Sequence, residues 1–407
     1  MSDAAPLSLE IARARMLAAV APVSGTELVA LGQLAGRILA ETLCAPRDLP
    51  DADCSAMDGY AVRHADLSQG ASLRLVGAAL AGSPAAVPVG PGQCARITTG
   101  GRLPAGADTV VIQEDVVREG DAVRLTAAPP RPGANVRRAG EDLARGAPVL
   151  PAGRRIGAIE IGTIAALGLA EARVFRRLRV ALLASGDELR PPGATLAPGQ
   201  IHDSNRQMLA AMLDRLGAEV RDFGILPDHR PVLRDAFRRA AAGADLVVSC
   251  GGASVGDADH TRAVLEELGR VDFWKVAIKP GKPFIYGRLG AALVCGLPGN
   301  PVSALVTFHQ LAVPVIRRLQ GADDPEPLVL TAAATAPLRR NRSRLELLRG
   351  RIESDGRGGL RAIPDPQQGS AAFAALSRCN AFLLVPAGTG EIAAGGPVQV
   401  LPFDELL

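Results

Sequence analysis

The feature that most constrains the fold is a regular alternation of apolar runs and helical patterns between residues 178 and 319. The apolar runs, which are typical of buried strands, lie at 179–185, 219–226, 245–249 and 293–296. The helical patterns lie at 205–216, 231–242, 260–269 and 301–319. Such alternation predicts a parallel sheet that is covered by helices. We expect this α/β domain to span residues 178–326.

The flanking regions have a different texture. Residues 46–140 contain short β-like runs separated by Gly and Pro, which predicts a β-rich domain. Residues 7–45 and 153–174 show helical spacing of their apolar residues, so we expect 1–45 and 141–177 to form one helical domain around a β-rich insertion. After the Pro- and Asp-rich segment 321–327 short strands return, and residues 327–407 are expected to form a second small β domain.

Polar residues and glycines gather where the predicted parallel strands end, which is where open α/β sheets bind ligands. They are Ser185, Gly186, Asp187 and Glu188; Asp228; Gly251, Gly252, Ser254, Gly256, Asp257 and Asp259; and Pro298, Gly299, Asn300 and Pro301. Glycines before a helix can offer N–H groups to a phosphate, and carboxylates beside phosphates suit Mg²⁺. Taken singly, the same residues also fit turns and helix caps, with Asn300 as N-cap and Pro301 at N1.

The lysines are confined to one segment. The chain has 45 lysines and arginines, and its only three lysines are Lys275, Lys279 and Lys282, so the other 42 cations are arginines. Lysine is a compact charge suited to a single oxyanion, whereas arginine is a planar fork. The cluster indicates an anion-binding role, with a solvated basic strand end as the alternative. If residues 275–279 form a strand, the Cα atoms of Lys275 and Lys279 lie roughly 13 Å apart, so the two would address different parts of an extended ligand.

The β-rich region carries three motifs of its own. They are SAMDGYAV, which contains Asp58; RITTGG, which contains Thr99; and RRAGED, which contains Arg137 and Asp142. From the residues alone they fit turns and an interdomain ion pair as well as a binding role.

Composition excludes several classes of protein. A net charge of +3 with mixed signs argues against a nucleic-acid partner. The six cysteines are scattered singly and the five histidines share no ligand spacing, which argues against a zinc site or a disulfide framework and favours a reducing cytoplasm. The N-terminal pattern is amphipathic rather than that of a signal peptide, and no apolar run reaches the ~18 residues that a membrane span needs.

Taken together, the motifs resemble the molybdopterin molybdenumtransferase family of the bacterial MoeA type, which is related to the E domain of gephyrin. The resemblance rests on SAMDGYAV, RITTGG, RRAGED, SGDEL, SCGGASVGDADHT, FWKVAIKPGKPF and GLPGNPVSA, which occur in this order. It extends from about Leu7 to Phe403. Thr98, beside Thr99, and Cys54, before SAMDGY, depart mildly from the family pattern and affect no expected charge role.

The resemblance implies a four-part, elongated and homodimeric subunit that ends in a small β-barrel. It implies insertion of molybdenum from molybdate into adenylyl-molybdopterin, with release of AMP and assistance by Mg²⁺. Carboxylates at ~4 Å from those phosphates would repel them by on the order of 4 kcal/mol per pair, which is an independent reason to expect a cation. Other molybdenum cofactor biosynthesis proteins and apo-molybdoenzymes are implied partners.

The resemblance also assigns roles to residues. Asp58 and Thr99 match residues that act at the partner subunit's site, and Arg137 and Asp142 match the edge of that site. Glu188, Asp228 and Asp259 match acids used in catalysis and in holding metal or nucleotide. Lys275 and Lys279 match a basic pair, and Pro298 and Pro301 a proline turn. Lys282, the third residue of the lysine cluster, lies outside the key pair and is expected to bind substrate.

Two other functions remain open at this point. The first is a molybdopterin adenylyltransferase, an activity associated with a related α/β domain and distinguished by its consumption of ATP. The second is a non-enzymatic scaffold of the gephyrin kind, against which the intact acids and lysines argue.

Overall fold

The computed structural model describes residues 6–83, 87–252, 260–323 and 327–403. It divides into two compact units. The first unit contains residues 1–40, 153–157 and 171–407, and the second contains residues 41–152 and 158–170.

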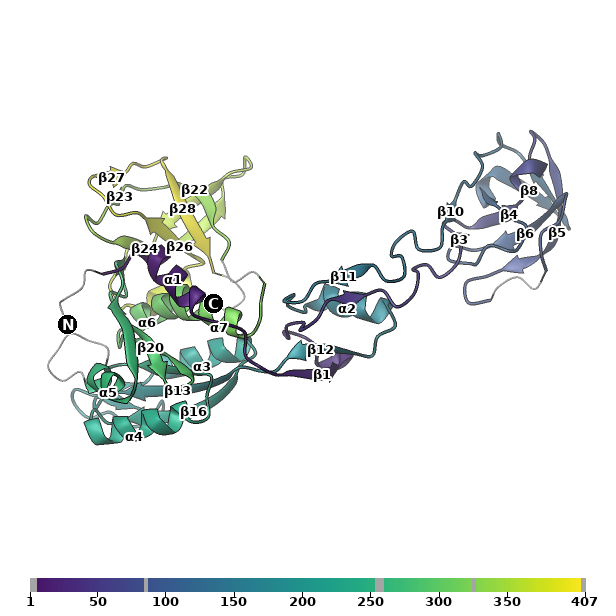
Figure 1. Ribbon diagram of the computed structural model, residues 1–407. Helices are drawn as coiled ribbons and strands as arrows, with labels where there is room; N and C mark the ends of the chain where they lie inside the picture. The colour runs from purple at the N-terminus through teal and green to yellow at the C-terminus, as the bar shows by residue number, and fades with distance from the viewer. Residues whose placement is uncertain (1–5, 84–86, 253–259, 324–326, 404–407) are drawn as a thin grey trace. The chain divides into compact units, whose positions relative to one another are not determined.

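The first unit is built on a mixed sheet with the strand order β16-β13-β17-β21-β20-β18. Figure 1 labels three of these strands, β13, β16 and β20. The strands are β13 (Arg179–Ser185), β16 (Glu219–Leu226), β17 (Leu246–Cys250), β18 (Arg270–Lys275), β20 (Pro283–Leu289) and β21 (Ala292–Leu297). The strands β16, β13, β17 and β21 are parallel to one another, as predicted. The strand β20 is antiparallel to both of its neighbours. A tight turn at Gly290, which has positive φ, joins it to β21.

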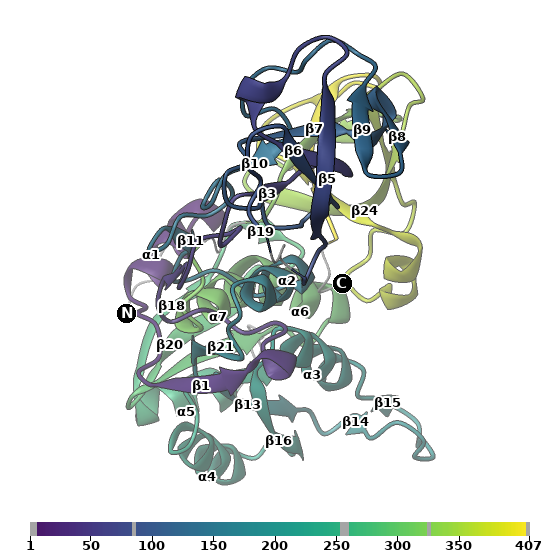
Figure 2. The same cartoon turned by 90° about the vertical axis from the view of Figure 1, so that its right-hand side faces the viewer.

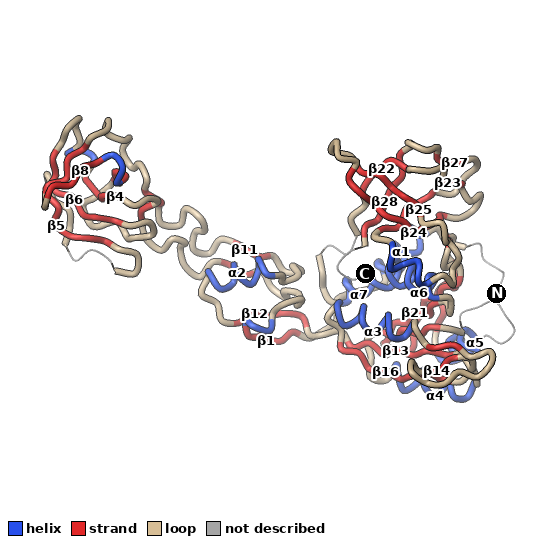
Figure 3. The backbone as a smooth tube through the Cα atoms, turned by 180° about the vertical axis from the view of Figure 1, so that it is seen from behind, coloured by secondary structure: helices blue, strands red, loops and turns tan. Residues whose placement is uncertain are grey.

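Helices cover both faces of this sheet (Figure 3). One face packs against α1 (Leu9–Ala18), α3 (Asn205–Arg215), α6 (Pro301–Thr307) and α7 (Val313–Leu319), with the π-helical turn η4 (Phe308–Ala312) between the last two. The other face packs against α4 (Arg230–Ala241) and α5 (His260–Leu268). Leu182 and Val248 point to the first core while Leu183 and Val247 point to the second, which is the alternation expected of strands buried on both sides.

The C-terminal part of the first unit is a closed β-barrel, as expected. Its strands are β22 (Leu330–Ala334), β24 (Leu345–Ser354), β25 (Leu360–Pro364), β26 (Ala381–Val385) and β28 (Pro397–Pro402), with a small side ribbon of β23 (Leu338–Arg339) and β27 (Glu391–Ile392). The barrel closes because β26 pairs with both β28 and β24. The two-residue strand β19 (Ile278–Lys279) adds to it alongside β24, so the α/β domain and the barrel share one hydrogen-bonded edge.

The prediction that residues 7–45 and 153–174 are helical is wrong for most of both segments. The only α-helix among the described residues of 7–45 is Leu9–Ala18, beside a 3-10 turn at Leu31–Gln33, and the only one in 153–174 is α2 (Ala158–Ala166). In place of the predicted helix pair, β1 (Thr26–Ala30) and β12 (Glu171–Phe175) form an antiparallel ribbon. Glycines with positive φ at Gly25, Gly36, Gly153 and Gly168 interrupt both regions and prevent long helices.

The second unit is β-rich, as predicted, around a sheet with the order β7-β4-β6-β5-β9-β8. These strands are β4 (Gly59–Val62), β5 (Ser72–Ala79), β6 (Gln93–Ile97), β7 (Thr109–Ile112), β8 (Val116–Glu119) and β9 (Ala122–Leu125). Two short antiparallel pairs accompany it, β3 (Cys54–Ser55) with β10 (Val136–Arg137) and β2 (Leu43–Cys44) with β11 (Pro148–Leu150). Small apolar clusters lie on both faces of the sheet.

Candidate active site

The carboxyl ends of β16, β13, β17 and β21 meet at one edge of the sheet. The amide of Gly186 donates to the carbonyl of Leu226 at 3.2 Å, and the amide of Gly251 donates to the carbonyl of Leu297, also at 3.2 Å. The loops that follow the four parallel strands are therefore neighbours. The structure brings together the predicted residues of these loops as far as they are described.

Three carboxylates lie at this edge. Asp187 and Glu188 follow β13, and the amide of Asp228, which follows β16, donates to Oδ1 of Asp187 at 3.1 Å. Burial raises the pKa of Asp228. The Ser185 hydroxyl opposes this rise, whereas the negative charges of Asp187 and Glu188 add to it. An acidic centre with repelling charges is the expected surrounding of a cation or of a proton-transfer group.

Close backbone approach explains the glycines after β17. A Cβ on Gly251 would overlap the carbonyl oxygen of Ser185, and a Cβ on Gly252 would overlap the hydroxyl of Thr261 at the start of α5. Both glycines have positive φ, of 93° and 63°. Among the described residues, the buried Ser185 hydroxyl makes no hydrogen bond of normal distance and angle, although it lies near enough to the Asp228 carboxyl to oppose the rise of its pKa. It is therefore a polar group available to a ligand.

The proline turn after β21 is held from two sides. The side-chain amide of Asn205, at the start of α3, donates to the carbonyl of Gly299 at 2.7 Å, and the Cys250 thiol donates to the carbonyl of Pro298 at 3.3 Å. Asn300 and Pro301 occupy the N-cap and first helical positions of α6, as predicted. The Asn300 side chain is exposed and makes no capping hydrogen bond, so its amide group does not stabilise the start of the helix.

Four of the predicted residues, Ser254, Gly256, Asp257 and Asp259, lie outside the described residues. Beyond Glu188, β14 (Leu189–Arg190) and β15 (Ile201–His202) form a short parallel ribbon (Figure 2). The amide of Ile201 donates to the carbonyl of Glu188 at 2.9 Å and so fixes the backbone of this acid.

The three lysines have different surroundings. The Lys275 ammonium lies over the ring of Trp274, 3.8 Å from its centroid. The Lys279 ammonium donates to the carboxylate of Glu346 at 2.8 Å. Lys282 is exposed, and its carbonyl accepts from the amide of Val276 at 3.0 Å. Lys275 and Lys279 thus differ in these contacts.

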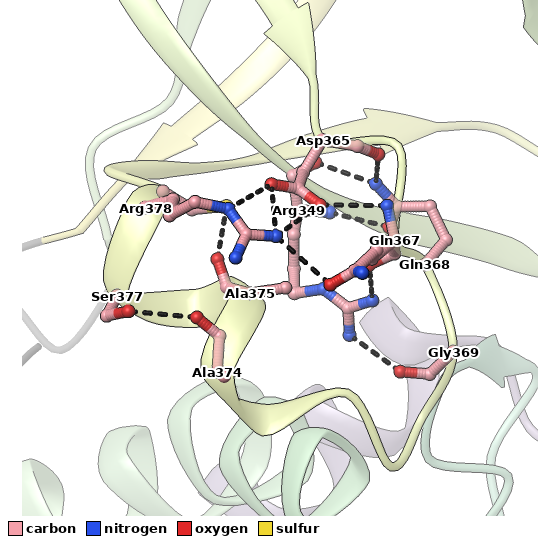
Figure 4. A network of polar contacts seen from close by, with 10 residues as sticks. Arg349, Asp365, Gln367, Gln368, Gly369, Ala374, Ala375, Ser377 and Arg378 are labelled. Carbon is pink, nitrogen blue, oxygen red and sulfur yellow. Dashed lines mark hydrogen bonds and ion pairs between the residues drawn. The ribbon is translucent and has the colours of Figure 1, made fainter.

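Two residues of β24 near the site, Glu346 and Arg349, were not predicted from the sequence. The Arg349 side chain, which is 1% exposed, donates to the backbone carbonyls of Gln367 and Gly369 (Figure 4). Burial lowers the pKa of its guanidinium. The adjoining carbonyl of Ser370 accepts from the amide of Val302 in α6, so the loop held by Arg349 contacts the helix that follows the proline turn.

The second unit holds the remaining predicted residues. The amide and the hydroxyl of Thr99 both donate to Oδ1 of Asp58, at 2.7 and 2.9 Å. These hydrogen bonds lower the pKa of Asp58, which is fully exposed. Arg137 and Asp142 form a loose, exposed ion pair at 3.9 Å. Asp58 and Thr99 are therefore one structural feature, a carboxylate fixed at the surface of the unit.

The residues expected to hold Mg²⁺ are carboxylates at the ends of the parallel strands. Within the described parts of the chain, no three His, Cys, Asp or Glu side chains are grouped so that they could hold a metal ion. Of the three predicted ligands, Glu188 and Asp228 are described and Asp259 is not. The donor chemistry fits, because carboxylate oxygens suit a hard cation. A cation would also favour the charged form of Asp228, whose pKa is raised by burial and by the neighbouring acids.

Three known domain families match the chain in succession. The MoeA N-terminal region (domain I and II) matches residues 7–168, a probable molybdopterin binding domain matches 181–318, and the MoeA C-terminal region (domain IV) matches 331–403. In the regions of the chain that are described, no helix is long and apolar enough to cross a membrane.

Known proteins resemble the chain over nearly its whole length. The molybdopterin molybdenumtransferase of Haemophilus influenzae is 42% identical over 402 residues, which cover 98% of this chain and 100% of that protein. Gephyrin from Dictyostelium discoideum is 30% identical over 92% of this chain and 59% of gephyrin. A crystal structure of a molybdopterin biosynthesis MoeA protein from Pyrococcus horikosii has a TM-score of 0.82 at 32% identity, with 98% and 100% of the two chains covered.

Proposed function

Because the chain belongs to the MoeA family of molybdopterin molybdenumtransferases, we propose that it inserts molybdenum from molybdate into adenylyl-molybdopterin, with release of AMP. The observation that carries this proposal is the edge where the loops after β13, β16, β17 and β21 meet. It combines glycines that admit a close ligand, carboxylates, and an unpartnered serine hydroxyl among the described residues. A phosphate-bearing, extended substrate needs this combination.

The acids are proposed to act on the phosphoanhydride. Glu188, Asp228 and Asp259 would hold Mg²⁺, which when bound supplies positive charge and polarises the bond to AMP. Asp228 is suited to this role because burial, together with the negative charges of Asp187 and Glu188, raises its pKa, and a bound cation would favour its charged form. Ser185 and Gly252 are proposed to contact the phosphates, through the serine hydroxyl and through the N–H group of Gly252. The N–H of Gly251 already donates to Leu297, so the part proposed for Gly251 is to leave room for the ligand, since no Cβ fits there.

The lysines are proposed to stabilise negative charge on the substrates. Molybdate is a dianion and the adenylylated cofactor carries phosphates, so two separate cationic groups have two separate anions to address. The Lys275 ammonium packs over the Trp274 ring, and the Lys279 ammonium forms an ion pair with Glu346, so both are held in place before a substrate binds. Donors that are positioned in advance stabilise developing charge without the cost of reorganisation.

Assembly and location are part of the proposal. Asp58 and Thr99 are fixed to each other in the second unit, and we propose that they complete the site of a partner subunit in a homodimer. The six cysteines are free thiols, which supports a cytoplasmic location. The product would pass to apo-molybdoenzymes or to other proteins of molybdenum cofactor biosynthesis.

The two alternative functions are less well supported. An adenylyltransferase would need only the α/β domain, whereas the matches here extend over the β-rich region and the barrel as well. A purely structural scaffold would not need a carboxylate with a raised pKa beside an unpartnered buried hydroxyl.

The test is an assay of AMP release from adenylyl-molybdopterin by the purified protein, with and without molybdate and Mg²⁺. We expect release that depends on molybdate and consumes no ATP. The formation of adenylyl-molybdopterin from ATP and molybdopterin would favour the adenylyltransferase instead. The absence of any turnover by a folded dimer, with both substrates present, would favour the scaffold.

A further inference from the structure

The ion pair between Lys279 and Glu346 joins the α/β domain to the barrel. Lys279 is the last residue of β19, which runs parallel to β24, and the two residues are in register there. The ammonium nitrogen lies 2.8 Å from Oε1 of Glu346, across 67 residues of sequence. Two backbone strands therefore fix the origins of both side chains, so the pair is defined by the fold and not by two mobile surface side chains.

Glu346 is set up as a fixed acceptor. The residue is 7% exposed, and burying a carboxylate is costly unless it is paired. The side-chain amide of Asn341 donates to the same oxygen at 3.3 Å. Glu346 thus has a cationic partner and a neutral partner, and the neutral one holds the carboxylate in place when the cation moves.

Lys279 retains capacity for a second anion. Its side chain is 53% exposed, in contrast to the 10% of Glu346. An ammonium group has three donors, and Glu346 accepts from one of them, so donors remain that can reach an oxyanion from the solvent side. The carboxylate of the pair is therefore buried at the edge of the barrel, while the ammonium is accessible from the solvent.

We infer that Glu346 is the positioning residue for Lys279: the barrel supplies the carboxylate that aims this ammonium at the oxyanion of the substrate. The inference rests on the proposed function, because it requires Lys279 to act in molybdenum insertion. It gives the C-terminal barrel a direct part in the chemistry of the α/β domain. Glu346 itself touches no substrate.

A positioning carboxylate predicts a particular kinetic pattern. Glu346 also repels an incoming oxyanion, so its replacement by glutamine removes a negative charge while a carbonyl oxygen remains to accept from Lys279. The ammonium is then held less firmly while anion binding is not weakened. We expect kcat to fall by about 5-fold or more, with the KM for molybdate unchanged or lower.

The experiment compares Glu346→Gln with Glu353→Gln. Glu353 lies on the same strand, β24, and is partly exposed beside Arg351 and Arg361, so its variant loses the same charge away from the lysine. AMP release is measured against molybdate concentration for both variants and the wild type. A lower kcat with an unchanged or lower KM in Glu346→Gln alone supports the inference. Any other pattern in a folded Glu346→Gln protein overturns it.

A second measurement needs no substrate. The chain has three lysines, so acetylation by an amine-reactive ester can be followed at each of them by mass spectrometry. An ammonium that donates to a carboxylate has to leave that contact before its nitrogen can react. In the wild type Lys279 should react about 3-fold or more slowly than exposed Lys282, as expected for a charge-assisted hydrogen bond. Equal or faster acetylation of Lys279 overturns the inference.

The two measurements separate the possible failures. If the wild type releases no AMP, the proposed function is contradicted, and the acetylation rates still decide whether Glu346 holds Lys279. If Glu346→Gln does not fold, Asn341→Ala replaces it, since Asn341 donates to the same carboxylate oxygen. Faster acetylation of Lys279 in that variant, at an unchanged rate for Lys282, supports the inference, and an unchanged rate for Lys279 overturns it.

Discussion

Thr99 fixes Asp58 through one oxygen atom: its amide and its hydroxyl both donate to Oδ1, at 2.7 and 2.9 Å. The two residues are 41 positions apart, and the turn after β6 brings Thr99 to the beginning of β4. A carboxylate that accepts two hydrogen bonds is favoured in its charged form, which is why the pKa of exposed Asp58 is lowered. The arrangement keeps a negative charge in a defined position at the surface of the unit.

The first prediction is that Thr99→Val raises the pKa of Asp58 toward the ordinary value of 3.8, because one of the two donors is lost and the amide remains. Because the folded-state pKa is lowered, the charged Asp58 stabilises the folded protein at pH values above its unfolded pKa. That stabilisation is lost as the pH falls through the folded-state pKa. The measurement is carboxyl titration by NMR. Thr98→Val is the control, since the Thr98 hydroxyl accepts from the amide of Ala81. An unchanged pKa in Thr99→Val would contradict the prediction.

The second prediction concerns the proposed homodimer. Asp58→Ala and Glu188→Ala subunits should each be nearly inactive alone, because each lacks one part of every site. A mixed dimer has one site that lacks both parts and one site that is intact. Up to half of the wild-type activity per dimer should therefore return. The measurement is AMP release by heterodimers purified with two affinity tags, and no recovery in such heterodimers would refute the shared site.

The third prediction is that Asp228→Asn stabilises the protein in metal-free buffer while it abolishes AMP release. Because the pKa of Asp228 is raised in the folded state, its charged form costs stability at neutral pH. Removal of that charge should raise Tm by about 2 °C, as often occurs when an active-site charge is replaced. The gain should shrink as pH falls toward 3.8, where the unfolded carboxyl also becomes neutral.

The control for this variant is Asp235→Asn, which removes an exposed acid of α4 that pairs with Arg239. This variant should keep its activity, and its Tm should change by no more than about 1 °C, since exposed ion pairs contribute little to stability. Thermal melts in EDTA at pH 4 and pH 7.5 are the measurement. A lower Tm for Asp228→Asn than for the wild type at pH 7.5 would show that its charge is not a cost in the free protein.

The sequence predicted most accurately those elements whose pattern is local. The strand at 179–185 and the helix near 205–216 appear within one residue of their predicted bounds, because each has a continuous apolar run or stripe that ends at a polar residue or a glycine. Because the carboxyl ends of parallel strands lie at the same edge of a sheet, Asp187, Asp228, Gly251 and Gly299 could be predicted to lie together without knowledge of any contact. Local pattern and chain direction were sufficient for this part of the site.

The prediction failed where a strand pairs with another that is far away in the sequence. Leu28 and its neighbours have apolar spacing that fits a helix, yet they form β1, because antiparallel pairing with β12 supplies their backbone hydrogen bonds. Glu346 was missed for a similar reason, since only the register of β19 against β24 shows that it faces Lys279. A carboxylate in a β-rich C-terminal segment carries no local signal of its lysine partner.

The last prediction concerns the identity of the lysines, with Lys279→Arg compared with Lys282→Arg. Arginine keeps the charge at position 279, but its longer, planar fork directs donors differently and would not place a compact charge between Glu346 and a substrate oxyanion. AMP release should fall by about 10-fold, which corresponds to ~1.4 kcal/mol of transition-state stabilisation. The Tm should barely change, because the Lys279 side chain is 53% exposed and lies in no core. Lys282→Arg, the same change at an exposed position three residues further on, should keep nearly full activity. The measurement is steady-state AMP release beside a thermal melt of each variant, and a wild-type rate for Lys279→Arg would mean that the reaction needs only a positive charge there.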